Sequence, residues 1–305
     1  MTASAPALVG LSGADWEVDF YSRPVLDADG RKRWDLLICA TPAIGSPLPL
    51  EGTPDTPFRF EKRCSANSVN SQWLREAFAE ALAEAERQGW PSPRRLRCWR
   101  GSMRAMVQRA AESLGLVVVP SRRCYALIDW LRERERTVYP QEEGYMAGPL
   151  APPPQPQRTP PLPWPEVARG DHWSWALLPL EALREAQEWS IGFAGLLPVP
   201  TEPRPQASVP GIRLFSRQRA LAVAGWLAGL EPARLEVDAD QLILEAGLDD
   251  RWRLASLPRD EATATREALQ RSREEVGGLQ FLAVQTSETS TSFEGFWMLK
   301  DQPDG

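Results

Sequence analysis

Residues 149–165 read PLAPPPQPQRTPPLPWP and hold nine prolines. Proline lacks a backbone N–H and fixes φ, so a run this dense excludes both a helix and a central β-strand. Such a segment behaves as a semi-rigid, polyproline-like spacer. It predicts that the 305-residue chain forms two domains, 1–148 and 166–305, joined by a linker at 149–165. The alternative is that the prolines form a ligand for a small recognition module.

The first domain changes from strand patterns to helix patterns along its length. The turn residues of DADG at 27–30 predict an antiparallel hairpin between its first two strands. The order of elements matches the ribonuclease-H-like arrangement, a mixed α/β sheet with helices on its faces, although an endonuclease-like α/β sandwich fits nearly as well. Strands are expected at 16–23, 32–40, 58–64, 94–100 and 116–120, and helices at 71–85 (capped by Asn70 or Ser71), 103–114 (capped by Ser102) and 125–136.

The second domain also alternates between strand and helix patterns, which predicts another mixed α/β fold. In its last strand, FEGFWMLK, alternation sends Trp297 and Leu299 to one face and Phe296 and Met298 to the other. Because both faces are apolar, this strand is expected inside a sheet. Strands are expected at 173–180, 190–200, 212–216, 234–247, 251–258, 279–286 and 293–300, and helices at 218–227 and 259–276.

Several classes of catalytic and metal site lack their residues in this sequence. Its cysteines are widely spaced, with no Cys-x-x-Cys pair, so neither a zinc site nor a disulfide framework is indicated. His172 is the only histidine, which argues against Ser-His, Cys-His and His-metal sites and favours a packing or edge role for it. Phosphate-loop and dinucleotide-binding glycine patterns are absent. The sequence therefore predicts a protein that is not an enzyme and holds no cofactor or metal.

The hydropathy of the sequence indicates the cellular location of the protein. No apolar run approaches the roughly 18–20 residues that a membrane span requires. The first residues, MTASAPALVGLSGADW, lack the basic and apolar regions of a secretory signal. These observations predict a cytoplasmic protein without a membrane span.

Positive charge is concentrated in one segment. Eleven arginines and four acidic residues lie between Arg94 and Arg136, which gives this segment +7 in a chain of net charge −6 and leaves −13 for the rest. Such asymmetry can attract an anionic polymer locally while the remaining surface keeps the protein in solution. We expect these guanidinium groups to share one exposed surface of the N-terminal half. The alternative is that they decorate solvated helices.

Arginine beside tryptophan is a typical combination for binding unpaired RNA, because cations contact the phosphates and aromatic faces stack on the bases. Trp99 lies between Arg97 and Arg100 and is the predicted stacking residue. Most of the thirteen tryptophans must nevertheless belong to the core, since burying an indole contributes roughly 4–6 kcal/mol. The predicted phosphate contacts are Arg94, Arg95, Arg97, Arg100, Arg104, Arg122 and Arg123.

A magnesium-dependent nuclease of ribonuclease-H-like or related fold is the enzyme alternative. Such a site gathers several carboxylates around the metal. Asp19 lies in the middle of the first strand, where the first metal ligand would stand, but the fourth strand offers arginines where another carboxylate is required. In Glu61-Lys62-Arg63 the lysine follows the acid by one position instead of two. Asp19 is therefore predicted to be an ion-pair partner of an arginine.

Several blocks of the sequence together resemble one family. The blocks are WEVDFYSRPVLDADGRKRWDLLIC (16–39), RCWRGSM (97–103), VVPSRRCYALIDWLRERERTVYP (118–140), IGFAGLLP (191–198) and GFWMLK (295–300). They are similar to the TAB/ATAB proteins of chloroplasts and cyanobacteria and follow the same order through both domains. The resemblance implies an RNA-binding protein that recognises unpaired A/U-rich messenger leaders and activates translation of a photosystem I reaction-centre subunit.

The resemblance also implies a role for the end of the chain. The family's closing Trp-Leu-Leu tripeptide, regarded as important for RNA binding, corresponds here to Trp297, Met298 and Leu299. Methionine in place of the middle leucine nearly conserves volume and apolarity. Either the tripeptide closes the core of the second domain and supports binding indirectly, or Trp297 itself stacks a base. The implied partners are single-stranded RNA and the translation machinery, and an adaptor that binds proteins through the proline-rich linker is a third alternative.

Overall fold

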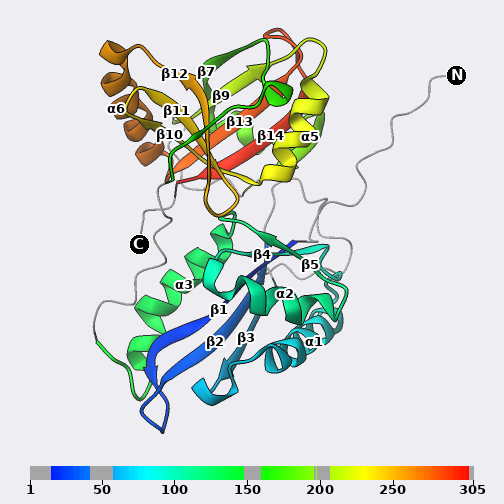
Figure 1. The fold of residues 1–305 in the computed structure, drawn as a ribbon, viewed down its shortest axis with the longest axis vertical. Helices are drawn as coiled ribbons and strands as arrows, with labels where there is room; N and C mark the ends of the chain where they lie inside the picture. The colour runs from blue at the N-terminus through cyan, green and yellow to red at the C-terminus, as the bar shows by residue number, and fades with distance from the viewer. Residues whose placement is uncertain (1–14, 42–57, 148–158, 196, 198–206, 302–305) are drawn as a thin grey trace, which may run out of the picture. The chain divides into compact units, whose positions relative to one another are not determined.

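A computed structural model describes residues 15–41, 58–147, 159–195, 197 and 207–301. The chain divides into two compact units, each made of two stretches of sequence. Unit 1 contains Met1–Val119 and Ala126–Leu150, and unit 2 contains Pro120–Tyr125 and Ala151–Gly305. Both units combine helices with mixed sheets, which confirms the predicted α/β class (Figure 1).

Unit 1 is built on a five-stranded sheet in the order β3-β2-β1-β4-β5. β2 runs antiparallel to β1, and β4 runs parallel to β1. This order and these directions are consistent with the ribonuclease-H-like arrangement. The strands are β1 (Asp15–Leu26), β2 (Lys32–Ala40), β3 (Arg59–Cys64), β4 (Arg95–Cys98) and β5 (Val117–Pro120), and the helices are α1 (Ser71–Arg87), α2 (Arg104–Glu112) and α3 (Tyr125–Thr137).

Local signals account for the first elements of unit 1. In the β1–β2 turn the Asp27 carboxylate accepts from two backbone amides at 3.0 Å, and Gly30 takes the left-handed φ of +73°. Asn70 caps α1 as predicted, since its side chain accepts from the Trp73 amide at 2.9 Å. The predicted Ser102 cap is wrong, because a 3₁₀ turn at Gly101–Met103 leads into α2 without a side-chain cap.

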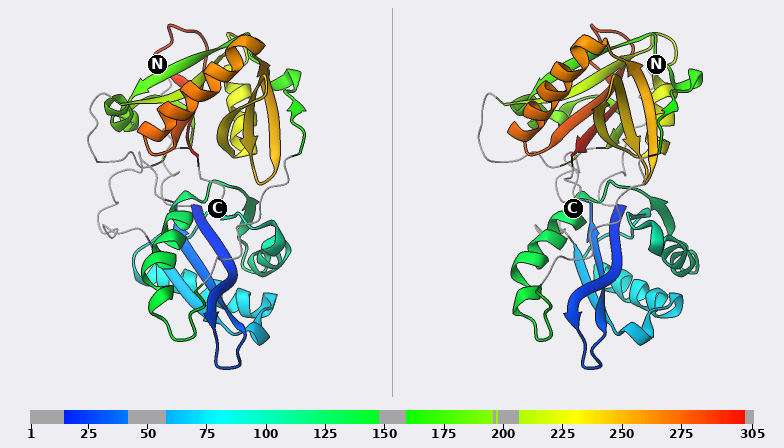
Figure 2. Two further views of the ribbon diagram at one scale, coloured as in Figure 1. Left: turned by 90° about the vertical axis from the view of Figure 1, so that its left-hand side faces the viewer. Right: turned by 60° about the vertical axis from the view of Figure 1, so that its left-hand side comes forward.

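The two faces of the unit 1 sheet differ in chemistry. On one face, alternate strand residues such as Val18, Phe20 and Leu96 pack against α1 and α2 in an apolar core. On the other face most of the intervening strand positions are charged, and Figure 2 shows α3 lying against this side. Strand alternation has therefore placed ionic groups inside the fold. The buried charged residues of these strands are Glu17, Asp19, Arg23, Arg33, Asp35 and Arg97.

Unit 2 contains two sheets. The larger has the order β7-β9-β13-β14-β8, and the smaller has the order β10-β11-β12-β6. The strands of the larger sheet are β7 (His172–Pro179), β9 (Ser208–Phe215), β13 (Leu279–Gln285), β14 (Phe293–Lys300) and β8 (Ile191–Gly195). Those of the smaller are β10 (Pro232–Asp238), β11 (Gln241–Ala246), β12 (Asp250–Ser256) and β6 (Leu162–Pro163), and the helices are α4 (Leu180–Arg184), α5 (Ala220–Leu230) and α6 (Arg259–Glu275).

The terminal strand β14 lies inside the larger sheet, between β13 and β8, as predicted. Trp297 and Leu299 join a core that includes residues of α5 and the smaller sheet. Phe296 and Met298 join a second core on the opposite face. The predicted division of this strand into two apolar faces is therefore confirmed.

Three other elements differ from prediction. Residues 234–247 form the β10–β11 hairpin instead of one strand, because the chain turns at Ala239, whose φ is +51°. β5 was predicted to be buried, but Val117 is exposed and the strand forms an edge of its sheet. The short helix α4 follows β7 where the sequence predicts no helix.

The proline-rich stretch is described only from residue 159 onward. Its residues 149–158 lie outside the described residues, so the predicted linker is not tested there. Leu162 and Pro163 pair with β12 at the edge of a sheet, where a missing N–H is tolerated. Trp164 is buried in the core of unit 2. This end of the stretch is thus part of the folded unit.

Candidate functional site

Three of the predicted phosphate-binding arginines surround one carboxylate at the start of β1. The Asp15 carboxylate lies 2.8 Å from Arg95, 2.9 Å from Arg97 and 3.6 Å from Arg94. β4 pairs with β1 in parallel, which sets Arg95 opposite Asp15. Arg97 is buried, whereas the side chain of Arg94 is 47% exposed. The structure therefore brings these arginines together but leaves Arg94 the most accessible of them.

Trp99 and Arg100 gather around Asp19 on the charged face of the sheet. The Asp19 carboxylate accepts from the Trp99 indole N–H at 3.1 Å, from Arg23 at 2.8 Å and from Arg100. The Arg100 guanidinium is stacked on the rings of Trp99 and Tyr21, at 4.4 and 4.0 Å from their centroids. Trp99 thus uses both its N–H and a ring face within the protein.

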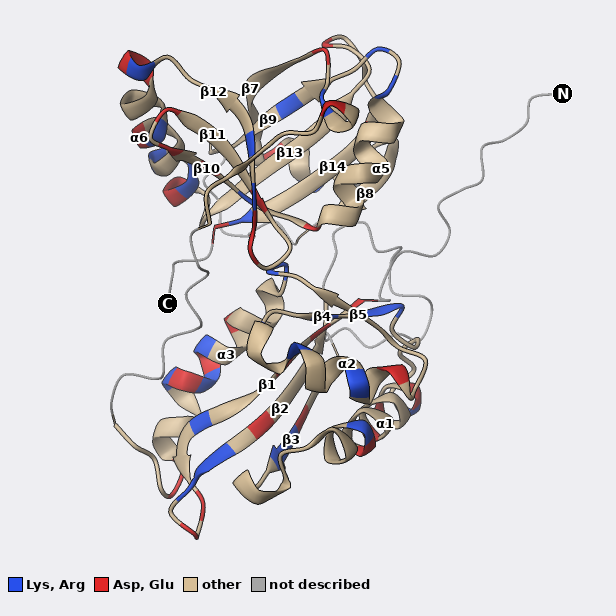
Figure 3. Ribbon diagram, viewed as in Figure 1, with Lys and Arg blue, Asp and Glu red and all other residues tan. Residues whose placement is uncertain are grey.

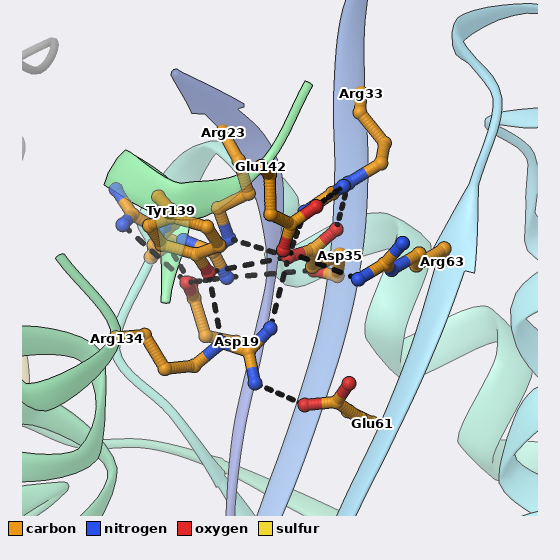
Figure 4. A network of polar contacts seen from close by, with 10 residues as sticks. Asp19, Arg23, Arg33, Asp35, Glu61, Arg63, Arg134, Tyr139 and Glu142 are labelled. Carbon is orange, nitrogen blue, oxygen red and sulfur yellow. Dashed lines mark hydrogen bonds and ion pairs between the residues drawn. The ribbon is translucent and has the colours of Figure 1, made fainter. Parts of the chain in front are cut away.

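Asp19 belongs to a larger buried ionic network, shown in Figure 4. Arg33 and Arg134 both pair with Asp35 of β2, at 2.9 and 3.8 Å, and Arg33 also pairs with Glu142. The Tyr139 hydroxyl contacts Asp35 at 3.2 Å. β1, β2 and α3 are therefore joined by alternating charges.

Burial and charge together set the ionisation of these carboxyls. Burial disfavours the Asp19 carboxylate, but Arg23 and Arg100 outweigh this effect and hold the pKa of Asp19 below its usual value. The hydrogen bond from Arg33 lowers the pKa of Glu142. Half-buried Glu135 shows the opposite shift, because desolvation raises the pKa of its carboxyl.

The remaining predicted phosphate contacts lie in different surroundings. Arg104 is exposed at the start of α2, and within the described residues no ion pair joins it to an acid. Arg122 belongs to unit 2, where its guanidinium contacts Glu245 of β11 at 2.9 Å. Figure 3 shows acidic and basic residues interleaved along α3. The expectation of one exposed arginine surface is wrong for Arg97, Arg100 and Arg123, which are buried.

Arg123 sits inside unit 2 as part of the segment Pro120–Tyr125. Its guanidinium donates to the carbonyl oxygens of Gly195, Pro232 and Met298 at 2.9, 2.6 and 2.9 Å. Neighbouring residues of this segment bond to the same unit. Ser121 donates to Glu231 at 2.9 Å, and the Tyr125 hydroxyl donates to the Ala233 carbonyl at 2.9 Å. The segment is therefore an integral part of unit 2, although it lies between β5 and α3 in the sequence.

The tripeptide Trp297, Met298 and Leu299 is buried in β14, and Trp297 is only 3% exposed. The Trp297 ring lies next to Gly195 of β8, where an added Cβ would be 2.5 Å from the ring. A buried indole cannot stack on a base without unfolding its surroundings. The structure therefore favours the core role for this tripeptide.

The ionic partners Arg23, Asp35, Arg134 and Glu142 were missed from sequence, although a signal for some of them exists. Asp19 and Arg23 share one face of β1, and Arg33 and Asp35 share one face of β2, while the alternate positions are apolar. Charges at alternate positions usually indicate a solvated face. Here α3 covers the face, a tertiary contact that the strand pattern does not contain.

In the described part of the chain, the Asp19 carboxylate is surrounded by arginines and not by the further carboxylates of a metal site. Among the described residues, no three His, Cys, Asp or Glu side chains are grouped so that they could hold a metal ion. Asp19 instead receives two guanidinium groups, as the predicted ion pair required. His172 contacts Glu288 at 3.0 Å and stacks on Phe215, which agrees with its predicted edge role.

Comparison with known proteins identifies the family. The family model described as RNA-binding protein Tab2/Atab2 N terminal matches residues 15–134, and the model of the C-terminal domain of RNA-binding protein Tab2/Atab2 matches residues 151–300. The chain belongs to the Tab2/Atab2 family of RNA-binding proteins. Each half of this Tab2/Atab2 protein thus carries its own family domain.

Two plant relatives extend this similarity along most of the chain. The chloroplastic protein TAB2 homolog of Zea mays is 36% identical over 301 residues, which cover 95% of this chain and 72% of that protein. The chloroplastic protein TAB2 homolog of Arabidopsis thaliana is 32% identical over 302 residues, covering 95% of this chain and 75% of that protein. No described helix of this Tab2/Atab2 protein combines the length and apolarity needed to cross a membrane.

Proposed function

We propose that this protein binds unpaired A/U-rich leader segments of messenger RNA in the cytoplasm and activates translation of photosystem subunits. The observation that supports this best is the match to RNA-binding family domains in both halves of the chain. The chloroplast location in the names of the plant relatives supports the link to photosynthesis. The translation machinery is the partner on which the bound protein would act.

The geometry divides the predicted RNA contacts into two groups. Arg94 and Arg104 are exposed in unit 1, so we assign phosphate contacts to them, with Arg95 beside Arg94. Exposed arginines can exchange their water for phosphate oxygens at little cost, whereas a buried arginine would first have to abandon the carboxylate or carbonyl oxygens to which it donates. The other predicted residues then support RNA binding indirectly, by stabilising the fold. They are Arg97, Arg100, Arg122, Arg123 and the tripeptide Trp297, Met298 and Leu299.

We further propose that the protein acts by binding and not by catalysis. The nuclease alternative requires Asp19 to face a divalent cation. Arg23, Arg100 and Trp99 occupy its oxygens instead. The guanidinium groups supply the positive charge that a metal would supply in a nuclease.

The test is a binding and translation assay with the purified full-length protein. Affinity should be higher for an A/U-rich single strand than for a G/C-rich strand or a duplex, and the RNA should stay intact with Mg²⁺. Adding the protein should raise translation of a reporter that carries a photosystem-gene leader. The variant Arg94→Glu/Arg104→Glu should lose both effects, whereas Arg259→Glu, at an exposed site of unit 2, should keep them.

Two outcomes would contradict the proposal. Equal affinity for all RNAs together with no effect on translation would remove the specific function. Magnesium-dependent cleavage that disappears in Asp19→Asn, under conditions in which this variant is still folded, would establish the nuclease in its place.

A further inference from the structure

Trp175 on β7 is the most exposed of the thirteen tryptophans, all of which lie within the described residues. It is 39% exposed, whereas the other tryptophans are buried or half-buried. We propose that Trp175 is the residue on which unit 2 stacks an unpaired RNA base. This inference rests on the proposed function, because it names a contact for the RNA that the protein binds.

The other tryptophans are engaged within the fold. Trp99, the residue predicted from sequence, is covered by the Arg100 guanidinium. A stacked base needs a ring face that solvent can reach, and most of these indoles already have a neighbour in that position. Ring or cation contacts involve Trp16 with Phe58, Trp34 and Trp73 with Phe20, Trp130 with Arg59 and Arg134, Trp164, Trp226 and Trp252 with one another, and Trp189 with Phe293 and Phe296.

The surroundings hold Trp175 in a fixed position. β7 is an edge strand of the larger sheet and pairs with β9, where Ile212 lies opposite Trp175. Trp173, two positions earlier on the same face, meets Trp175 edge to face at 5.5 Å and 81°. An aromatic ring fixed in this way loses little conformational entropy when a base stacks on it.

Exposed cations lie where the chain enters this strand. Arg219 donates to the carbonyls of Glu166 and Arg169 at 3.3 and 2.9 Å, which joins the loop before β7 to the loop after β9. Arg169 and Arg217 are exposed on these loops, and no ion pair with an acid involves either of them within the described residues. Ala168 and Ala220, from the same region, pack in one core cluster with Trp173. The loops and the tryptophan pair therefore lie on the same side of the sheet.

Acidic residues occur in this region as well. Asp171 uses its carboxylate to accept from the Arg217 backbone amide at 2.8 Å, and Glu288 contacts His172. Glu166 is exposed as the first residue of η4, the 3₁₀ turn at Glu166–Ala168. The loops are therefore mixed in charge, and the stacking ring contributes more to the proposed contact than electrostatic attraction does.

A protein segment is the other chemical class that an exposed edge strand can accept. Leu177, on the same face as Trp175, is 64% exposed and would add apolar area to such a contact. The observations favour RNA because the family binds RNA and because exposed guanidinium groups accompany the ring. A stacked base requires the indole ring itself, whereas protein docking would depend on Leu177 as well.

The test compares full-length variants on the same A/U-rich single-stranded RNA. Trp175→Ala should weaken binding about fivefold to a hundredfold, the range found when one stacked base loses its aromatic partner. Trp175→Phe should retain most of the affinity, and Leu177→Ala should bind like the wild type. Photocrosslinking of RNA containing 5-bromouridine should mark the tryptic peptide Gly170–Arg184 at Trp175, and this measurement needs no folded variant.

The outcomes separate the inference from the proposed function. Suppose that the wild type binds the RNA, that Trp175→Ala binds it with unchanged affinity, and that no adduct forms in Gly170–Arg184. These results would overturn the inference and leave the proposed function standing. Failure of the wild type to bind the RNA would remove the proposed function itself. Normal RNA binding by both variants, with loss of a protein partner from both, would assign this edge to protein docking instead.

Discussion

The Arg123 guanidinium donates a 2.9 Å hydrogen bond to the carbonyl oxygen of Met298, across 175 positions of sequence. This contact joins two of the blocks that carry the family resemblance, the SRR segment and the terminal tripeptide. Both lie in unit 2, so a change in either should disturb the same structure. Both blocks therefore contribute to the integrity of β14.

Arg123→Met should destabilise unit 2 selectively. The change leaves the carbonyls of Gly195, Pro232 and Met298 without this donor, and each unsatisfied buried acceptor costs about 1–3 kcal/mol. Hydrogen exchange followed by mass spectrometry should show faster exchange in β10 and β14 and unchanged protection in β1 and β2. Arg132→Met, at a partly exposed residue 3.9 Å from Asp129, is the matched control. Equal loss of protection in both units, or none, would show that Arg123 is not specific to unit 2.

Asp19→Asn should destabilise unit 1 while keeping the shape of the side chain. It removes the carboxylate from Arg23 and Arg100, and breaking a buried ion pair on one side costs about 3–5 kcal/mol. Urea unfolding should show this loss, and Asp29→Asn in the exposed β1–β2 turn should not. Replacing Arg100 as well, in Asp19→Asn/Arg100→Met, should restore part of the stability. An Asp19→Asn protein as stable as the wild type would contradict the structural role of Asp19.

Acid should destabilise the protein through Glu245. Burial raises the pKa of this carboxyl, but Arg122 and Arg234 outweigh burial, and the folded pKa lies below the usual value of 4.5. As pH falls, Glu245 therefore takes up a proton in the unfolded chain before it does so in the folded protein. The stabilisation that ionised Glu245 provides is complete above pH 4.5 and is lost as pH falls through the folded pKa. The free energy of unfolding, measured with urea from neutral pH down to about pH 3, roughly one unit below ordinary carboxyl pKa values, should fall less steeply with pH in Glu245→Gln. An identical slope in the variant would exclude Glu245 as a contributor.

The four cysteines should be inert in the native protein. All are buried, and desolvation raises the pKa of Cys98 to about 12 and that of Cys64 to about 11. Thiolate is the reactive form, so alkylation at mildly alkaline pH should be very slow until the protein unfolds. Mass spectrometry after brief iodoacetamide treatment, with and without urea, measures this. Rapid labelling of Cys98 in the native state would contradict its burial.

Local patterns were sufficient to predict most of the fold. The β1–β2 hairpin, the Asn70 cap and the central position of β14 follow from alternation, turn residues and capping, which are properties of short stretches. The β10–β11 hairpin was missed because Ala239 takes a left-handed conformation without a glycine to mark the turn. The inclusion of Pro120–Tyr125 in unit 2 depends on partners more than a hundred positions away, such as Pro232.

The candidate site was harder to predict than the fold. Charge counting identified the arginine-rich segment but could not separate exposed Arg94 from buried Arg97, because burial depends on how β4 lies beside β1. Trp99 beside Arg100 is a typical RNA-binding pair in sequence. In the fold that pair is bound to Asp19, a residue 80 positions away from Trp99.

The salt dependence of RNA affinity distinguishes exposed arginines that bind phosphates from buried arginines that stabilise the fold. For single strands, log affinity decreases linearly with log salt concentration, and the magnitude of this negative slope is smaller by about 0.7 for each phosphate contact removed. Arg94→Gln/Arg104→Gln should therefore flatten the wild-type slope by about 1.4 without changing the melting temperature. A wild-type affinity independent of salt, or a slope unchanged in this variant, would contradict the account.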